Sequence, residues 1–206
     1  MQCGLDHGAL AGEIEALGLP VLQVASRAVH RTAYLMRPDL GRRLDPGSAA
    51  ALETAAAGAG DLQPDLVLVV ADGLSARAAQ QHAVPLLRCL LAALGAGWRL
   101  GPVVIAQQAR VALGDEIGQR LRAALVAVLI GERPGLSAPD SLGVYLTWNP
   151  RLGRSDAERN CLSNIRPQGL AATDAAATLA WLCREARRLQ RTGIVLKDRS
   201  DLKDAR

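Results

Sequence analysis

Aromatic side chains are scarce in this chain of 206 residues: they make up 2% of it, and phenylalanine is absent. Proteins that recognise single-stranded nucleic acid stack the bases on aromatic rings. With so few rings available, the sequence argues against nucleic acid as a partner.

Lysine is nearly absent as well. Lys197 and Lys203 are the only two, so arginine supplies almost all of the 24 basic side chains, and the net charge is +4. The excess of positive charge lies in residues 132–206. Arginine pairs with carboxylates and phosphates through a planar, bidentate group. A partner surface is one explanation of this composition, and a GC-rich genome is another.

Long hydrophobic runs and paired cysteines are also missing. The apolar runs at residues 66–71 and 125–130 are far shorter than the roughly 18 residues that span a bilayer, and the first residues lack the regions of a signal peptide. The four cysteines show no C-x-x-C spacing, which disfavours a zinc site and a disulfide framework. We therefore expect a soluble protein of the reducing cytoplasm, with no membrane partner and no bound metal ion.

What the sequence does contain is an alternation of strands and helices. Short runs rich in valine and leucine, typical of strands buried on both faces, cover residues 20–25, 66–71, 102–107 and 125–130. Between them, apolar residues recur at helical spacing over residues 46–57, 75–94 and 113–121. Pro85 is expected to kink or split the second of these helices, because proline lacks an amide donor.

The last third of the chain departs from this alternation. We expect a fifth strand at residues 142–148, an ordered but irregular excursion at residues 149–169, and a final helix at residues 173–191. The whole pattern predicts a single α/β domain over residues 1–196, with a doubly wound, mostly parallel, Rossmann-like sheet. A charged tail follows at residues 197–206.

In a doubly wound sheet, ligands bind at the carboxyl ends of the strands. That rule nominates residues 72–75, 107–111 and 131–135 as the ligand edge. Acids and arginines lie there, but the three histidines do not cluster with acids, so no base or nucleophile pair is evident. The pattern favours a binding subunit over a complete enzyme.

One motif at this edge needs a separate test. The strand-to-helix turn at residues 72–75 nearly matches the nucleophile elbow G-x-S-x-G, although its last glycine is missing. His82, the only later histidine, is about 10 Å along the same helix and too far away to take the Ser75 proton. Ser75 is therefore interpreted as a helix N-cap. Neither lysine follows a glycine, so the sequence contains no phosphate-binding P-loop.

Five strings of the chain carry a family resemblance. They are RTAYLMRPDLGRRL at residues 31–44, ADGLS at 71–75, ARVALGDEIG at 109–118, GERPGL at 131–136 and RNCLSNIR at 159–166. Together they resemble the small subunit of ethanolamine ammonia-lyase, and several long strings in the right order are far more specific than one short motif. The likeness covers nearly the whole chain, although the family usually carries a further N-terminal segment.

The resemblance implies an adenosylcobalamin-dependent lyase that converts ethanolamine to acetaldehyde and ammonia by radical chemistry. In such an enzyme a large TIM-barrel subunit holds the substrate and the reacting face of the cofactor, and the small subunit covers the corrin from the other side. The implied partner is therefore the large subunit, in a higher hetero-oligomer, with no catalytic residue in this chain. Packaging in a bacterial microcompartment is a further implication, and it depends on the N-terminal segment.

The family's cobalamin contacts fall at positions that match Val111, Glu132 and Cys161 here. Val111 and Glu132 also follow the third and fourth predicted strands, at the nominated edge. The corrin ring is rimmed with neutral amides, whose N–H groups a carboxylate can accept. The open alternatives are that Glu132 pairs with Arg133 or another arginine, that Val111 belongs to the core, and that Cys161 is a buried small hydrophobe.

Cobalamin bound by this family member is expected to keep its own lower base. The sequence lacks D-x-H-x-x-G, the motif whose histidine replaces that base.

The long, arginine-bearing segments at residues 31–44 and 151–166 are assigned to the interface with the large subunit, since arginine and tyrosine are favoured at interfaces. Solvated loops are the alternative for both segments. For the chain as a whole, two other classes stay open. One is a stand-alone α/β hydrolase or nucleotide-binding enzyme that uses Asp72 and Ser75, and the other is a non-catalytic scaffold that binds only protein.

Overall fold

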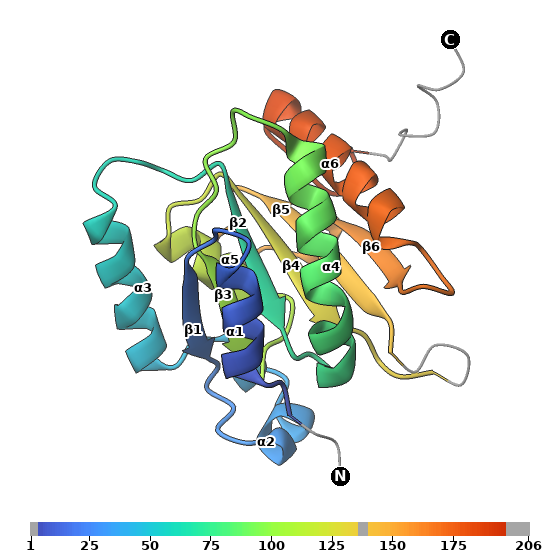
Figure 1. Cartoon of the computed structure of the whole chain (residues 1–206). Coiled ribbons are helices and arrows are strands. Elements are labelled where there is room, and N and C mark those ends of the chain that lie inside the picture. Colours follow the sequence, from blue (N-terminus) through green and yellow to red (C-terminus); the bar gives the residue numbers. More distant parts are fainter. Residues whose placement is uncertain (1–3, 136–139, 197–206) are drawn as a thin grey trace.

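The computed structural model describes residues 4–135 and 140–196 and contains one six-stranded sheet, in the order β1-β3-β2-β4-β5-β6 (Figure 1). The tail predicted at residues 197–206 lies outside the described residues. The strands are β1 (Val21–Ala25), β2 (Leu66–Ala71), β3 (Val103–Gln107), β4 (Leu125–Gly131), β5 (Leu142–Trp148) and β6 (Arg159–Ile165).

The sheet is parallel over its first four strands and antiparallel beyond them. β1, β3, β2 and β4 pair in parallel, as the apolar runs predicted. β5 pairs antiparallel with β4, and β6 pairs antiparallel with β5. All residues of β2 and β4 are buried, which explains why their sequences read as unbroken apolar runs.

Helices cover both faces of the sheet, as a doubly wound fold requires. The helices are α1 (His7–Glu15), α2 (Arg31–Met36), α3 (Pro46–Gly58), α4 (Ala76–Leu94), α5 (Leu113–Arg120) and α6 (Ala172–Leu189). α1, α4 and α6 pack on one face, and α3 and α5 pack on the other (Figure 1). The chain therefore leaves β2 and β3 toward opposite faces, so a topological switch point lies between the carboxyl ends of these two strands.

Four elements differ from the sequence expectation. α1 was not predicted from the sequence at all. Pro85 does not split α4, which is one helix from Ala76 to Leu94. α2 occupies part of the segment expected to be a loop, and its N-cap is His30, whose Nδ1 accepts the backbone N–H of Ala33 at 3.1 Å. β6 takes up residues 159–165 of the predicted excursion. Cys161, Ser163 and Asn164 are solvent-exposed because β6 is an edge strand. Most residues of β6 are polar, so the sequence lacks the apolar run or alternation that predicts a strand.

A buried ion pair fastens β6 to the parallel part of the fold. Arg159, the first residue of β6, donates two hydrogen bonds to the carboxylate of Asp115 in α5, at 2.6 and 2.7 Å, and both side chains are 2% exposed. Arg159 also donates to the hydroxyl of Thr147 in β5 at 3.0 Å. Since a buried charge of this kind must be paired, the ion pair determines where the chain rejoins the sheet after β5.

Candidate functional site

The turn after β2 is held by a buried carboxylate. Asp72 is 5% exposed and accepts hydrogen bonds from the backbone N–H groups of Gly73 at 2.9 Å, Gln108 at 2.9 Å and Ala109 at 3.1 Å. Burial raises the pKa of Asp72, and these backbone bonds act in the opposite direction. Asp72 therefore joins the turn after β2 to the turn after β3, and its oxygens are engaged with backbone groups.

Ser75 closes the same turn as a helix cap. Its hydroxyl accepts the backbone N–H of Ala78 at 3.3 Å, at the start of α4. His82 points elsewhere: its Nε2 is 3.9 Å from the carboxylate of Asp140. The capping interpretation is confirmed, and Ser75 and His82 do not form a nucleophile–base pair.

Two glycines allow this turn to pack on the end of β4. Gly73 has a φ of +56°, and a Cβ there would meet the carbonyl oxygen of Gly131 at 2.3 Å. A Cβ on Gly131 would meet the carbonyl oxygen of Ser75 at 1.9 Å. The ends of β2, β3 and β4 thus form one continuous edge. We call residues 72–75, 108–111 and 131–132, with the adjoining Ser163 and Asn164 of β6, the carboxyl rim.

Val111 belongs to the turn after β3, which is fixed from several sides. Gln108 lies in the left-handed region, with a φ of +52°. Its carbonyl accepts the hydroxyl of Ser26 at 2.7 Å, and the backbone N–H of Arg110 donates to the carbonyl of Gly41 at 2.8 Å. Val111 itself is half-buried and packs against the core beneath α3 and α5.

Glu132 follows β4 and reaches across to β6. One carboxylate oxygen accepts the hydroxyl of Ser163 at 2.6 Å, and the other accepts the backbone N–H of Asn164 at 3.1 Å. A Cβ on Gly143 would lie 2.9 Å from the first oxygen, so the carboxylate passes close over the β5 backbone. Because a carboxylate offers about four acceptor sites, Glu132 retains acceptor capacity beyond these two bonds.

Cys161 lies on β6 opposite Tyr145 of β5. It is exposed, so the alternative of a buried core cysteine is wrong. Burial raises the pKa of Tyr145 to about 12, and the neighbouring Cys161 and Glu132 act in the same direction. Burial also raises the pKa of the Cys161 thiol; the hydrogen bond with Tyr145 acts in the opposite direction, and the charge of Glu132 adds to the rise. Both groups are therefore uncharged at neutral pH.

The structure links two of the three predicted cofactor contacts. Ser163, the partner of Glu132, is two residues beyond Cys161 and on the same side of β6. Val111 lies further along the edge, because β2 separates the strand that precedes it from the strand that precedes Glu132.

Sequence reasoning missed Tyr145, Ser163 and Asn164 as neighbours of Glu132. Only the pairing of β4, β5 and β6 brings them near Glu132, with Ser163 and Asn164 at the rim and Tyr145 opposite Val128, midway along β4. An alternating pattern in residues 159–165 would have been the available signal, but polar side chains occupy both faces of that strand.

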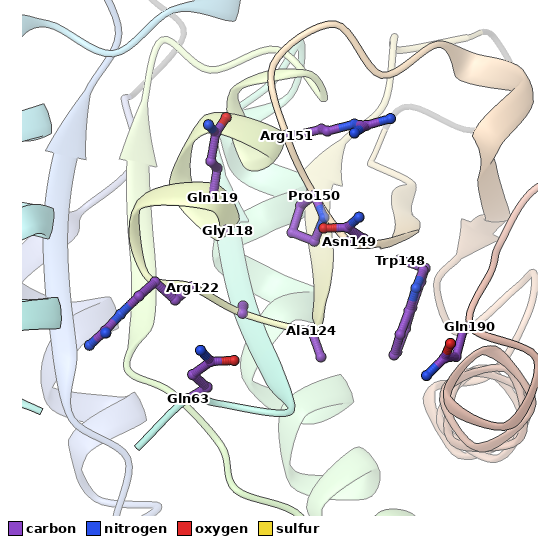
Figure 2. A pocket seen from close by; sticks show the side chains of 11 residues that line it. Gln63, Gly118, Gln119, Arg122, Ala124, Trp148, Asn149, Pro150, Arg151 and Gln190 are labelled. Carbon is purple, nitrogen blue, oxygen red and sulfur yellow. The ribbon is translucent and has the colours of Figure 1, made fainter. Parts of the chain in front are cut away.

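A cavity of about 520 Å³ lies at the opposite edge of the sheet (Figure 2). Its lining comes from the end of α5, the loop before β4, the end of β5 and the residue after α6; it includes Gln119, Arg122, Trp148 and Gln190. None of the nominated ligand-edge residues lines it. The carboxyl rim is therefore separate from this cavity.

Over residues 4–135 and 140–196, no helix has the length and apolar character needed to cross a membrane. In the same part of the chain, no three His, Cys, Asp or Glu side chains are placed to hold a metal ion. The fold and the rim together define a doubly wound α/β protein in which Glu132 and the fixed turn before Val111 lie at the carboxyl ends of the parallel strands, and an exposed thiol lies on the adjoining strand β6.

Comparison with known proteins identifies the particular family. The chain belongs to the family described as Ethanolamine ammonia-lyase light chain (EutC), whose sequence model matches residues 2–197. A protein of Pseudomonas aeruginosa named ethanolamine ammonia-lyase small subunit is 52% identical over 198 residues, which cover 96% of this chain and 72% of the relative. Relatives with the same name in Rhodopseudomonas palustris and Ralstonia nicotianae are 53% identical, over 100% of this chain and 77% of theirs, and 49% identical, over 96% and 73%. The enzyme that names the family is a lyase.

The role of Ser75 predicts a stability effect. Ser75→Ala removes the cap of α4 and is expected to lower the free energy of unfolding by about 1 kcal/mol, measured by urea denaturation. Ser75→Gly serves as the control, because glycine at this position costs only a few tenths of a kcal/mol. Equal stability of Ser75→Ala and the unmodified chain would contradict the capping role.

Proposed function

We propose that this chain is the small subunit of an adenosylcobalamin-dependent ethanolamine ammonia-lyase, and that its carboxyl rim helps the large catalytic subunit hold the cofactor. The bound adenosylcobalamin supplies the radical chemistry by which ethanolamine becomes acetaldehyde and ammonia. The observation that carries the proposal is that Val111 and Glu132 follow β3 and β4 at the ligand edge of the sheet, while Cys161 is exposed on the adjoining strand β6. A half-site of this kind suits a ligand that a second chain covers.

The chemistry of the rim fits a corrin ring. The ring's amide N–H groups need acceptors, and Glu132 has acceptor capacity left after binding Ser163 and Asn164. Tyr145 and Cys161 are neutral, so covering them with a large apolar ring desolvates no further charge. The turn that carries Val111 offers backbone groups in a fixed conformation.

The histidines support a cofactor that keeps its own base. His30 caps the N-terminus of α2. His82 lies in α4, and its Nε2 is 3.9 Å from the carboxylate of Asp140. His7 is the first residue of α1. In these positions none of the three histidines stands on the carboxyl rim.

The surface beside the rim suits the large subunit. Val29, Leu35 and Met36 expose 85%, 51% and 76% of their surface, in and next to α2 at the same edge of the sheet. The ring of Tyr34 is buried beneath them between two guanidinium groups, of Arg31 at 4.7 Å and Arg110 at 4.2 Å. Exposed apolar side chains on an ordered helix are typical of a protein interface.

The other part of the predicted interface, residues 151–166, is divided by the fold. The first half, up to η2 (Asp156–Glu158), leaves β5 at the edge opposite the carboxyl rim, and β6 then returns to the rim. We therefore place the large-subunit contact on α2 and on the rim end of β6.

The rival functions meet specific obstacles. A hydrolase would need Ser75 and Asp72 free, whereas the first caps α4 and the second binds backbone N–H groups. A purely structural scaffold would give no reason for the Glu132 carboxylate at the ligand edge to lie near a phenol and an exposed thiol on β5 and β6. The three described cysteines are unpaired, which supports the cytoplasm as the location of the enzyme; packaging in a microcompartment stays a prediction.

The test of the function is co-expression with and without the large subunit, followed by a corrinoid titration and a lyase assay. Acetaldehyde formation is expected only when both chains and adenosylcobalamin are present, because this chain has no acid–base pair of its own at the rim. Acetaldehyde formed by this chain alone would contradict the proposal. Assembly with the large subunit that takes up no corrinoid would assign the scaffold role instead.

Glu132 gives a sharper prediction. Glu132→Gln keeps one acceptor oxygen and Glu132→Ala keeps none, so both should raise the adenosylcobalamin concentration that the assembled enzyme needs, alanine more than glutamine. A lost acceptor in a desolvated interface costs about 1–3 kcal/mol. Turnover at saturating cofactor should fall less, because the reacting atoms lie in the other subunit.

The control for this series is Ser163→Ala, which removes one tie between Glu132 and β6 but leaves the carboxylate. The adenosylcobalamin concentration that the assembled Ser163→Ala enzyme needs should be close to that of the unmodified enzyme. If Glu132→Ala also titrated like the unmodified chain while the two subunits assembled, Glu132 would be only a tie between β4 and β6.

Met36 tests the interface. Met36→Asp places a charge on the exposed end of α2 and should weaken binding of the large subunit by about 2 kcal/mol or more, because an unpaired carboxylate would be desolvated. Ile194→Asp is the matched control, since Ile194 is 77% exposed and lies near the opposite edge of the sheet. Titration of a tagged large subunit measures both variants. Equal binding by the two would place the interface elsewhere.

A further inference from the structure

Two buried acids flank the central strand β2. Asp65 precedes it and is 7% exposed, and Asp72 follows it and is 5% exposed. Asp65 accepts the backbone N–H of Arg99 at 2.9 Å, before β3 begins. Asp72 accepts the N–H groups of Gln108 and Ala109, after β3 ends. The neighbouring strand β3 is therefore held at its entry by one acid and at its exit by the other.

The exit of β3 needs such support more than the entry does. Gln108 adopts a φ of +52°, which is unfavourable for a residue with a side chain and persists only where the surroundings fix it. Its own side-chain oxygen is buried without a hydrogen-bond partner, so the side chain does not hold the turn. The backbone bonds to Asp72, with the Ser26 hydroxyl on the Gln108 carbonyl, supply the fixation.

Several neighbours of Asp72 oppose the burial that raises its pKa. Arg31, the first residue of α2, donates to the carbonyls of Gly73 at 2.6 Å and Leu74 at 3.1 Å, beside the carboxylate. Attraction to Arg31 and the three backbone N–H bonds oppose the effect of burial on the carboxylate. Asp72 sits at the switch point of the sheet, where the chain leaves β2 and β3 toward opposite faces.

We propose that Asp72 is the positioning residue of the cofactor site: it fixes the turn at residues 108–111 in the conformation that presents Val111 to the corrinoid. The inference rests on the function proposed above and assigns Asp72 no contact with the cofactor. Val111 is two residues beyond Ala109, the last N–H that Asp72 holds. Loosening the turn therefore displaces the Val111 backbone without removing any group from the rim.

The test is Asp72→Asn in the chain assembled with the large subunit. Asparagine keeps the shape of the side chain but replaces one acceptor oxygen by an NH₂ donor, so one of the backbone N–H groups faces another donor. The dissociation constant for adenosylcobalamin, measured by equilibrium dialysis, should rise about tenfold, which corresponds to roughly 1.4 kcal/mol. Turnover at saturating cofactor should stay within about twofold, because the reacting groups lie in the other subunit.

Asp65→Asn is the matched control, because it makes the same exchange at the other end of the same strand. In hydrogen-exchange mass spectrometry, Asp72→Asn should accelerate exchange in peptides covering residues 103–113, whereas Asp65→Asn should leave those peptides and cofactor binding unchanged. Ser26→Ala, which loosens the same turn through the Gln108 carbonyl, should weaken cofactor binding in the same direction and serves where Asp72→Asn does not fold.

The outcomes separate this inference from the proposed function. An unmodified complex that binds no corrinoid would overturn the function itself. An unmodified complex that binds corrinoid, with equal losses for Asp72→Asn and Asp65→Asn, would show that Asp72 stabilises the fold without positioning the site. A loss of turnover in Asp72→Asn with normal cofactor binding would also overturn the inference.

Discussion

A strand buried on both faces obliges the polar groups at its two ends to find partners inside the protein, because water does not reach them. β2 is such a strand, and Asp65 and Asp72 satisfy this requirement by binding backbone N–H groups at the two ends of β3. The rest of the rim builds on this arrangement. The turn after β2 packs on Gly131 at the end of β4, and Glu132 extends from there to β6.

The sequence predicts the parallel part of this fold well, because buried strands and the long helices leave strong local patterns. The apolar runs locate β1 to β4 within a residue or so, and the helical spacing locates α3 to α6. α1, α2 and β6 were not predicted. The two helices are short, with nine and six residues, and most residues of β6 are polar. For Pro85 the prediction was wrong in the opposite sense: a kink or break was expected there, but α4 continues through this residue as one helix.

The site is predictable to a lesser degree, and the reason is physical. The rule that ligands bind at strand ends nominates the turns with Asp72, Val111 and Glu132, and each lies at the edge it predicted. What those residues bond to depends on contacts between segments far apart in the chain. The pairing of Glu132 with Ser163 and Asn164 follows from the order β4-β5-β6, which no local pattern encodes.

In the function proposed above, a half-site at the rim also changes what each subunit contributes. A large planar cofactor has two faces to remove from water, and one surface can cover only one of them. Residues that are neutral and fixed in place, such as Tyr145 and the turn carrying Val111, can meet such a ligand with little reorganisation. The small chain then contributes a rigid wall, while the chemistry stays with its partner.

The enclosure of Tyr34 between Arg31 and Arg110 has a kinetic consequence. The ring is 1% exposed, and Arg110 also donates to the Tyr34 carbonyl at 3.0 Å, so α2 is held in place from within the subunit. In the interface proposed above, α2 is a docking helix ordered in advance, and such a helix loses little conformational entropy when two chains meet, unlike a segment that folds upon binding. Encounter between the subunits is then governed by diffusion and orientation, and complex formation should need no slow rearrangement of this surface.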